Sequence, residues 1–271
     1  KHKVAIYISF FVITSIIISS LLSVYVYKQA NLFIGILTFI ITFIPITQLV
    51  TQIIQSILNK IIKPVLVPKM DYSCGVPEQE TTMVIIPCIV KSGKKVKDLI
   101  SKLEVFYLAN KSENIYFTLL GDTSASDKEK EKYDEDIIKT GIEEIERLNK
   151  KYPDKKMGKF QFIYRKRLWN EGEKCFLGWE RKRGLINQFN EYLLGNIENR
   201  FKANTIEEEK QKNSLPKIKY IITLDSDTNL ILNSGLELIG AASHILNKPE
   251  LNKTKDVVIK GHALIQPRVG I

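Results

Sequence analysis

The chain has 271 residues with a formal net charge of +10 at pH 7, and 44% of its residues are hydrophobic. The length allows one large domain or two small ones, and the charge favours an anionic partner, whether nucleotide diphosphate, lipid headgroups or nucleic acid. The three cysteines Cys74, Cys88 and Cys175 are too widely spaced to indicate a disulfide framework or a zinc site, so we expect a reducing compartment.

The N-terminal part is almost free of charge. Lys28 is the only charged residue between Lys3 and Lys60, and residues 4–27 and 32–50 form two apolar runs. A membrane-spanning helix requires roughly 20 such residues. A cleaved signal peptide is disfavoured because the first run is too long and a second run follows at once. We therefore predict a two-helix transmembrane hairpin, with Pro45 as a kink.

Lysines flank this hairpin on one side. They precede the first run and follow the second at Lys1, Lys3, Lys60, Lys63 and Lys69. The positive-inside rule then places the soluble portion in the cytoplasm. Residues 49–62 carry an amphipathic stripe, which we interpret as an interfacial helix lying on the bilayer; the alternative is the tail of the second span. Pro64 and Pro68 mark a linker, residues 64–81.

From residue 82 onward, apolar runs alternate with helical patterns. We expect strands at 83–90, 115–120, 160–164 and 218–224, and helices at 96–109 and 127–151. This alternation predicts an α/β fold whose sheet is mostly parallel, with helices on both faces. Residues 205–217 are rich in Glu, Lys and Asn, and we expect an exposed loop there.

Two carboxylates follow the last predicted strand. Asp225 and Asp227 come directly after the apolar run that begins at Tyr220. Carboxylates one residue apart can share a divalent cation that neutralises a diphosphate, although a solvated turn is the simpler alternative. The phosphatase pattern Asp-x-Asp-x-Thr is excluded because Asn229 occupies the Thr position.

A third carboxylate, Asp122, follows the strand predicted at 115–120. It could accept a hydrogen bond from a nucleobase or a ribose hydroxyl, or it could simply form a turn. Ligands bind beyond the carboxyl ends of the strands in open α/β sheets, where neighbouring strand ends converge. We therefore expect Asp122 to lie near Asp225 and Asp227.

Three consecutive cations, 181–183, precede Gly184 and a helical pattern. This arrangement suits an anion at a helix N-terminus, although a charge run is more often a solvated face. The spacing Lys182-x-Gly184-x-x-Asn187 is similar to the nucleotide-diphosphate loop of processive family 2 type glycosyltransferases. By contrast, we expect Arg165, in the basic run 165–167, to be a solvated surface charge.

Several stretches of the chain form a pattern together. They are Val67 to Ser73, Gly75 to Glu78, Phe106 to Asn110, Leu119 to Asp122, Arg165 to Asn170, Gly178 to Gly184, Thr223 to Thr228 and Leu264 to Val269. In these stretches the chain resembles the glycosyltransferase family 84 portion of cyclic β-1,2-glucan synthases, and their order and spacing hold from residue 65 to the end.

The resemblance implies a GT-A type domain over residues 82–271 that uses UDP-glucose and Mg²⁺ or Mn²⁺ to build linear β-1,2-glucan with inversion. The metal would be held by Asp225 and Asp227, and uridine would be positioned by Asp122. The resemblance further implies that Lys182, Arg183, Gly184 and Asp225 contact the nucleotide sugar. Asp227 and Lys182 would be catalytic.

The resemblance also implies the setting of the reaction. The expected partners are UDP-glucose, the growing glucan acceptor, membrane lipids, and downstream cyclising and trimming domains, with no nucleic acid. We expect a multi-pass protein of a bacterial-type inner membrane, with its catalytic domain in the cytoplasm.

We also expect the chain to be a piece of a longer protein and incomplete as a catalyst. The resemblance implies an Asp base well after the metal motif, and only 44 residues follow Asp227, so the base would lie beyond Ile271. His244 and His262 are poor candidates for that role. Two alternatives stay open: another membrane polysaccharide synthase of the family 2 type, and a non-catalytic membrane module whose basic runs bind anionic lipid or nucleic acid.

Overall fold

The computed structural model describes residues 2–62, 66–197, 201–212 and 215–267. The chain forms two compact units, Lys1–Leu66 and Val67–Ile271. Lys1 and Lys63 of the predicted membrane flank, Pro64 of the predicted linker, and Arg268 and Val269 of the last resembling stretch lie outside the described residues.

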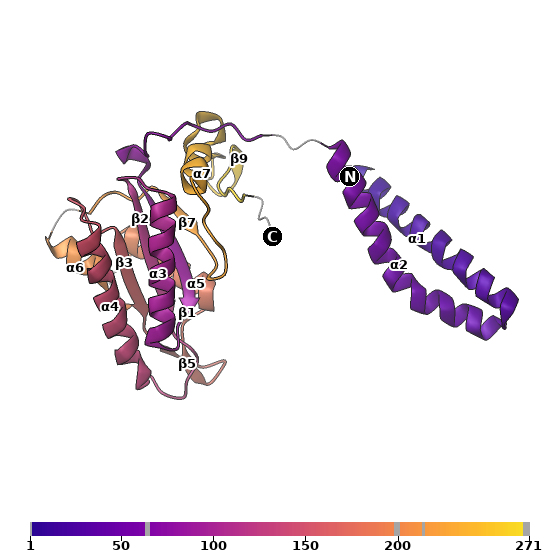
Figure 1. Ribbon diagram of the computed structural model, residues 1–271, viewed down its shortest axis with the longest axis horizontal. Helices are drawn as coiled ribbons and strands as arrows, with labels where there is room; N and C mark the ends of the chain where they lie inside the picture. The colour runs from indigo at the N-terminus through magenta and orange to yellow at the C-terminus, as the bar shows by residue number, and fades with distance from the viewer. Residues whose placement is uncertain (1, 63–65, 198–200, 213–214, 268–271) are drawn as a thin grey trace. The chain divides into compact units, whose positions relative to one another are not determined.

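The first unit is a helical hairpin of α1 (His2–Gln29) and α2 (Leu32–Ile61), which lie side by side (Figure 1). Asn31 begins α2, because its side-chain oxygen accepts a hydrogen bond from the Ile34 amide at 3.0 Å. The Ser23 hydroxyl donates to the Gly35 carbonyl at 2.8 Å, and a Cβ at Gly35 would lie 3.0 Å from Tyr27 Cβ. The close approach of the helices therefore depends on the small residue at 35.

Both helices are long and apolar enough to cross a membrane by length and composition, over Val4–Gln29 and Leu32–Ile61. Helix α2 continues through Pro45 to Ile61. The amphipathic stripe that begins at residue 49 therefore belongs to the same helix as the second apolar run. Its location at a bilayer interface stays a prediction.

The second unit contains a five-stranded sheet in the order β6-β3-β2-β1-β7. The strands are β1 (Thr82–Ile89), β2 (Ile115–Asp122), β3 (Phe160–Arg165), β6 (Phe201–Asn204) and β7 (Tyr220–Thr223). Strands β7, β1, β2 and β3 are parallel, and β6 pairs with β3 in the antiparallel sense. The predicted mostly parallel α/β fold is confirmed.

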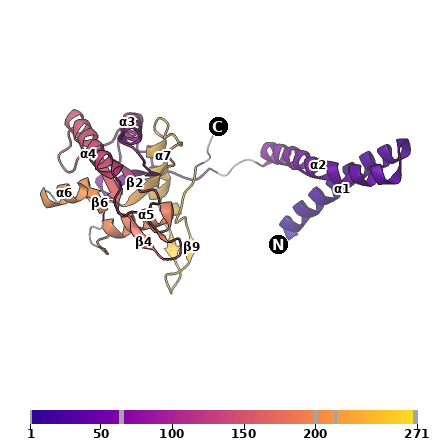
Figure 2. The ribbon, with the colours of Figure 1, turned by 90° about the horizontal axis from the view of Figure 1, so that it is seen from below.

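Helices cover both faces of this sheet. They are α3 (Gly93–Ala109), α4 (Tyr133–Lys151), α5 (Arg181–Leu193) and α6 (Thr205–Lys212). Helices α3 and α4 lie on one face, and α5 lies on the other (Figures 1 and 2). Each face has its own apolar core, one containing Leu103 of α3 and Ile145 of α4, the other Phe189 of α5 and Ile206 of α6. The central strand β2 is buried along its whole length.

The remaining elements are smaller. They are η1 (Glu78–Glu80), α7 (Ser234–Ser243), η2 (Ile245–Asn247), the hairpin β4 (Leu168–Asn170) with β5 (Cys175–Leu177), and the hairpin β8 (Glu250–Leu251) with β9 (Val258–Lys260). Helix α7 follows the Asp225–Asp227 segment in the chain, so its anchoring bears on the position of these carboxylates.

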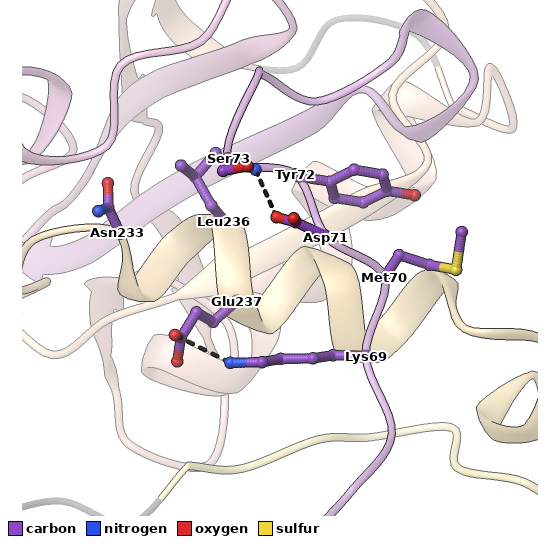
Figure 3. A pocket seen from close by; sticks show the side chains of 8 residues that line it. All are labelled: Lys69, Met70, Asp71, Tyr72, Ser73, Asn233, Leu236 and Glu237. Carbon is purple, nitrogen blue, oxygen red and sulfur yellow. Dashed lines mark hydrogen bonds and ion pairs between the residues drawn. The ribbon is translucent and has the colours of Figure 1, made fainter.

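The segment 68–73, predicted as part of a linker, lies along α7 (Figure 3). The Met70 amide donates to the Gly240 carbonyl at 3.0 Å, and the Tyr72 hydroxyl donates to Ser243 Oγ at 2.8 Å. Between segment and helix lies a pocket of about 250 Å³. Its lining residues are Lys69, Met70, Asp71, Tyr72, Ser73, Asn233, Leu236 and Glu237. This segment is thus held to α7 by specific contacts.

The expectation of an exposed loop at 205–217 is wrong for the first part of this range, which forms helix α6 directly after β6. Ile206 is fully buried in the core beneath α5. Thr205 Oγ1 accepts a hydrogen bond from the Phe162 amide at 2.9 Å, and the side-chain oxygen of Asn204 accepts one from the Ile206 amide at 3.1 Å. One apolar anchor and these polar contacts hold a helix whose other residues are mostly charged.

Candidate functional site

The carboxyl edge of the sheet gathers the residues that the sequence singled out. Asp122 is the last residue of β2 and pairs in register with Ile89 at the end of β1. Strand β7 ends at Thr223, two residues before Asp225. The loop before α5 reaches the same edge, because Lys182 of α5 contacts Asp225. Three separate chain segments therefore meet where open α/β sheets bind ligands.

Lys182 and Asp225 form an exposed ion pair. The Lys182 ammonium group donates to the Asp225 carboxylate, although the two residues lie 43 positions apart in the chain. Their side chains remain 45% and 63% exposed, respectively. The predicted diphosphate loop and the predicted metal-binding carboxylates are therefore neighbours. A ligand that arrives from solvent can reach both groups.

The carboxylate segment is a turn held by α3. The Thr228 amide donates to the Asp225 carbonyl at 3.0 Å, and the Lys102 ammonium group donates to the Ser226 carbonyl at 2.9 Å. Both Asp225 and Asp227 are exposed. Within the described ranges no group of three or more His, Cys, Asp or Glu side chains is gathered for a metal. Two open carboxylates fit Mg²⁺, which binds one or two protein carboxylates together with substrate phosphates.

Asp122 forms a buried ion pair with Arg165. Arg165 Nη1 lies 3.3 Å from Asp122 Oδ2, and the side chains are only 2% and 3% exposed. Burial raises the pKa of Asp122, although Arg165 and the Thr123 amide oppose this shift. Burial likewise lowers the pKa of Arg165, against the attraction of Asp122. The expectation that Arg165 is a solvated surface charge is wrong, because its side chain points into the edge of the sheet.

Arg165 also organises the loop that leads into α5. Its Nη2 donates to the Trp179 carbonyl at 2.5 Å, and its Nη1 donates to the Arg181 carbonyl at 3.1 Å. Its Nε donates to Gln188 Oε1 at 2.8 Å. One guanidinium group therefore ties the end of β2 to the loop and to the body of α5. Arginine suits this role because its five donors have a fixed planar arrangement.

Two glycines allow the loop that leads into α5 to pack closely against Arg165 and against the start of the helix. A Cβ at Gly184 would collide with the carbonyl oxygen of Trp179, and one at Gly178 would lie 2.6 Å from Arg165 Nη1. Sequence reasoning assigned Gly184 to the nucleotide sugar. The structure adds a packing reason for the same residue, since any side chain there would displace the start of α5.

The backbone at the start of α5 is strained. Glu180 and Arg181 adopt left-handed conformations, with φ angles of 48° and 51°. Within the described part of the chain, Glu180 makes no side-chain capping hydrogen bond to the helix. Non-glycine residues in this region cost free energy, and such strain is concentrated at functional sites.

An open hollow of about 670 Å³ lies beside Lys182. Its lining residues are Trp179, Lys182, Arg183, Ile186, Asn187 and Asn190. The Arg183 side chain is 83% exposed and forms an ion pair with Glu180, with Nε and Oε2 3.1 Å apart. Lys182 therefore belongs both to the ion pair with Asp225 and to the lining of this hollow.

Sequence reasoning missed a second buried ionic cluster around Asp134. Arg167 Nη1, Lys202 Nζ and the Tyr164 hydroxyl donate to its carboxylate at 2.6, 2.9 and 2.8 Å. Burial opposes ionisation, but these hydrogen bonds hold the pKa of Asp134 well below its ordinary value. Arg167 is buried while Lys166 beside it is exposed, and both lie in the connection between β3 and β4, so the basic run alone did not show which of its cations would be enclosed.

The class of protein follows from this arrangement: an α/β protein with a cation-bearing helix start and a carboxylate pair at the carboxyl edge of its sheet. No protein-family model matches the chain. The chain is similar to cyclic beta-(1,2)-glucan synthase NdvB of Rhizobium meliloti (strain 1021), with 36% identity over 196 residues. This alignment covers 72% of the chain and 7% of that protein. The predicted resemblance to cyclic β-1,2-glucan synthases is therefore confirmed, over a small part of the relative's length.

Proposed function

We propose that the chain is part of a membrane glycosyltransferase that transfers glucose from UDP-glucose to a growing β-1,2-glucan, with inversion at the anomeric carbon. The observation that carries this proposal is the contact of Lys182 with Asp225 beside an open hollow of about 670 Å³. A cation at a helix start and a neighbouring carboxylate pair are the groups that a metal-bound diphosphate requires. The glucan synthase relative supports the same assignment.

Asp225 and Asp227 would hold Mg²⁺ or Mn²⁺, and the bound ion would neutralise the diphosphate. Lys182 would stabilise the negative charge that develops on the leaving UDP, as cationic side chains do in phosphoryl sites. Arg183 and Gly184 belong to the same loop. Because Lys182 and Asp225 pair with each other in the structure, we expect ligand binding to exchange this pair, with Lys182 turning to phosphate and Asp225 to metal.

In the proposed reaction, the acceptor 2-hydroxyl oxygen forms a bond to the glucose anomeric carbon while the bond from that carbon to the diphosphate oxygen breaks. UDP leaves with the electron pair, and the hydroxyl proton passes to a base. Asp122 would position uridine. Since Arg165 holds the Asp122 carboxylate, we infer that the ion pair as a unit forms this part of the nucleotide site.

Calorimetry on the detergent-solubilised chain tests the metal assignment. UDP should bind with Mn²⁺ or Mg²⁺ present and lose at least about tenfold in affinity with chelator or in Asp227→Ala, as expected for a lost charge-assisted contact. Glu146→Ala is the control, since Glu146 is an exposed carboxylate on α4. Equal UDP affinity with and without metal would contradict the assignment.

The proposed setting is a multi-pass protein of a bacterial-type inner membrane, with the second unit in the cytoplasm, where nucleotide sugars are available. Its proposed partners also include membrane lipids and downstream cyclising and trimming domains. The two apolar helices and the flanking lysines support this topology. An impermeant thiol reagent applied to intact cells should leave the exposed Cys74 unmodified and label it after lysis. Labelling before lysis would reverse the topology.

Two alternatives make different predictions. A synthase of another polysaccharide would give a different product when radiolabelled UDP-sugars are offered one by one. A non-catalytic module would bind anionic lipid or nucleic acid through its basic runs without metal. The burial of Arg165 and Arg167 disfavours this module, because two of the three cations in one run do not face solvent.

A further inference from the structure

The hollow beside Lys182 extends beyond Lys182 and Arg183, the two lining cations that suit a diphosphate. Beyond Lys182 it continues along α5, where Ile186, Asn187 and Asn190 provide one apolar side chain and two amides. Trp179 lies at the same hollow, and its side chain is 46% exposed. Aromatic rings beside hydrogen-bonding amides suit a ligand with both C–H faces and hydroxyl groups.

The exposure of Trp179 does not come from a loose loop. Its carbonyl oxygen accepts from Arg165 Nη2 at 2.5 Å, and a Cβ at Gly184 would lie 2.9 Å from the edge of its ring at Cε3. The backbone is therefore fixed, and the neighbouring residue has no side chain that would displace the indole. The chain holds an aromatic surface in place and leaves it open to solvent.

Asn190 provides an independent observation. Its side-chain oxygen is buried and has no hydrogen-bond partner among the described residues. Buried polar atoms are nearly always paired with protein or solvent groups. Asn190 also lines the hollow, so rotation of its side chain toward a bound ligand would give this buried oxygen the partner that it lacks.

We propose that this hollow binds the acceptor glucan, with a glucosyl ring stacked on Trp179 and hydroxyl groups bonded to Asn187 and Asn190. The inference rests on the proposed function. The donor glucose is fixed through its diphosphate near Lys182, whereas the lining from Lys182 to Asn190 extends about 12 Å along α5 at 1.5 Å per residue. That length exceeds one sugar ring and fits a chain. A lipid tail would require a more apolar lining than one with four polar residues out of six.

The test uses the two tryptophans of the chain. Trp169 is the matched control: it is 48% exposed but lies on the β4–β5 hairpin, where it packs edge-on against Phe176 with ring centroids 5.2 Å apart. Trp169→Phe leaves Trp179 as the only indole, and Trp179→Phe leaves Trp169. The full chain in detergent is titrated with linear β-1,2-linked gluco-oligosaccharides while its fluorescence is recorded.

A saturable fluorescence change is expected in Trp169→Phe and not in Trp179→Phe. Adding Asn190→Ala to Trp169→Phe should weaken the oligosaccharide affinity about tenfold, as for loss of a bond to a buried group. No saturable change in Trp169→Phe, or equal changes in the two single variants, would overturn the inference. UDP binding by Trp169→Phe, measured by calorimetry, separates the outcomes: UDP binding without a glucan signal rejects the acceptor site alone, and loss of metal-dependent UDP binding rejects the proposed function.

Discussion

Two ion pairs of the same chemical type lie at the carboxyl edge of the sheet and differ in burial. The Asp122–Arg165 pair is almost fully enclosed, whereas both side chains of the Lys182–Asp225 pair are about half exposed. Removing a pair from water costs several kcal/mol per ion, so a buried pair is not a reliable source of stability. An exposed pair contributes only about 0–1 kcal/mol. The first pair therefore fixes geometry, and the second can be exchanged for a ligand at little cost.

Burial acts on both partners of the enclosed pair. It raises the pKa of Asp122 and lowers the pKa of Arg165, so it disfavours the charged form of each. The hydrogen bonds of Arg165 to Asp122, to two loop carbonyls and to Gln188 offset the free-energy cost of burying its charge. Removing either charge would leave the other without compensation.

The largest expected effect is therefore that of Arg165→Ala. It should lower the free energy of unfolding by about 3–5 kcal/mol, the usual result of leaving one charge of a buried pair, and the unfolding midpoint by roughly 10 °C. Thermal unfolding followed by circular dichroism measures the change in the unfolding midpoint. Lys166→Ala is the matched control, since Lys166 is the exposed neighbour in the same basic run. Equal shifts in both variants would show that burial does not distinguish them.

Lys182→Ala should act on binding and leave stability nearly unchanged. Charge-assisted hydrogen bonds are worth about 1.5–3 kcal/mol, so UDP affinity should fall about tenfold or more. Metal affinity without nucleotide should rise slightly, because Asp225 loses a competing cation. Both can be measured by calorimetry. Arg183→Ala should cost less, because its side chain is 83% exposed and paired with Glu180. A larger loss in Arg183→Ala would contradict the exchange of the Lys182–Asp225 pair.

Gly184→Ala tests the backbone that joins the two ion pairs. The added methyl group would collide with the Trp179 carbonyl, which also accepts from Arg165. Overpacking of this kind costs about 1–3 kcal/mol, and we expect reduced UDP affinity as the loop shifts. Gly172→Ala is the control, because a Cβ there would meet only a side-chain oxygen of Asn170 at 3.3 Å. Unchanged stability in Gly184→Ala would mean that the loop adapts freely.

Much of the sheet was predictable because buried parallel strands are continuous apolar runs, as in β1 and β2. The placement of Asp122 and of the Asp225–Asp227 segment at one edge followed from the convergence of strand ends. The contact of Lys182 with Asp225 did not follow from that argument, because Lys182 lies on helix α5. The short edge strand β6 and the charged helix α6 were not predictable, because Ile206 alone supplies the apolar anchor of that helix in the core.

The burial of Arg165 could not be read from a basic run, since its partner Asp122 is 43 residues away. The hollow was equally hidden in the sequence. Ile186 and Asn190 lie on one face only once α5 forms, because residues four apart in a helix are neighbours.

The smallest expected effect concerns pH and extends the comparison to the other buried cluster. The pKa of Asp134 is held well below its ordinary value of 3.8, chiefly by hydrogen bonds from Arg167 and other donors that outweigh burial. The unfolded chain therefore takes up a proton at this carboxyl before the folded chain does. The contribution of the Asp134 carboxylate to the free energy of unfolding is fully present well above about pH 4, and it declines as the pH falls toward the folded-state pKa.

Between about pH 6 and pH 3 the wild type should lose about 1 kcal/mol more stability than Asp134→Asn, in which this linkage is absent. Denaturant unfolding at the two pH values measures the difference. Glu135→Gln serves as the control, since Glu135 is exposed on the same turn of α4. A similar acid response in the wild type and in Asp134→Asn would show that Arg167, Lys202 and Tyr164 do not hold this carboxylate ionised, and that the buried cluster acts only through its packing.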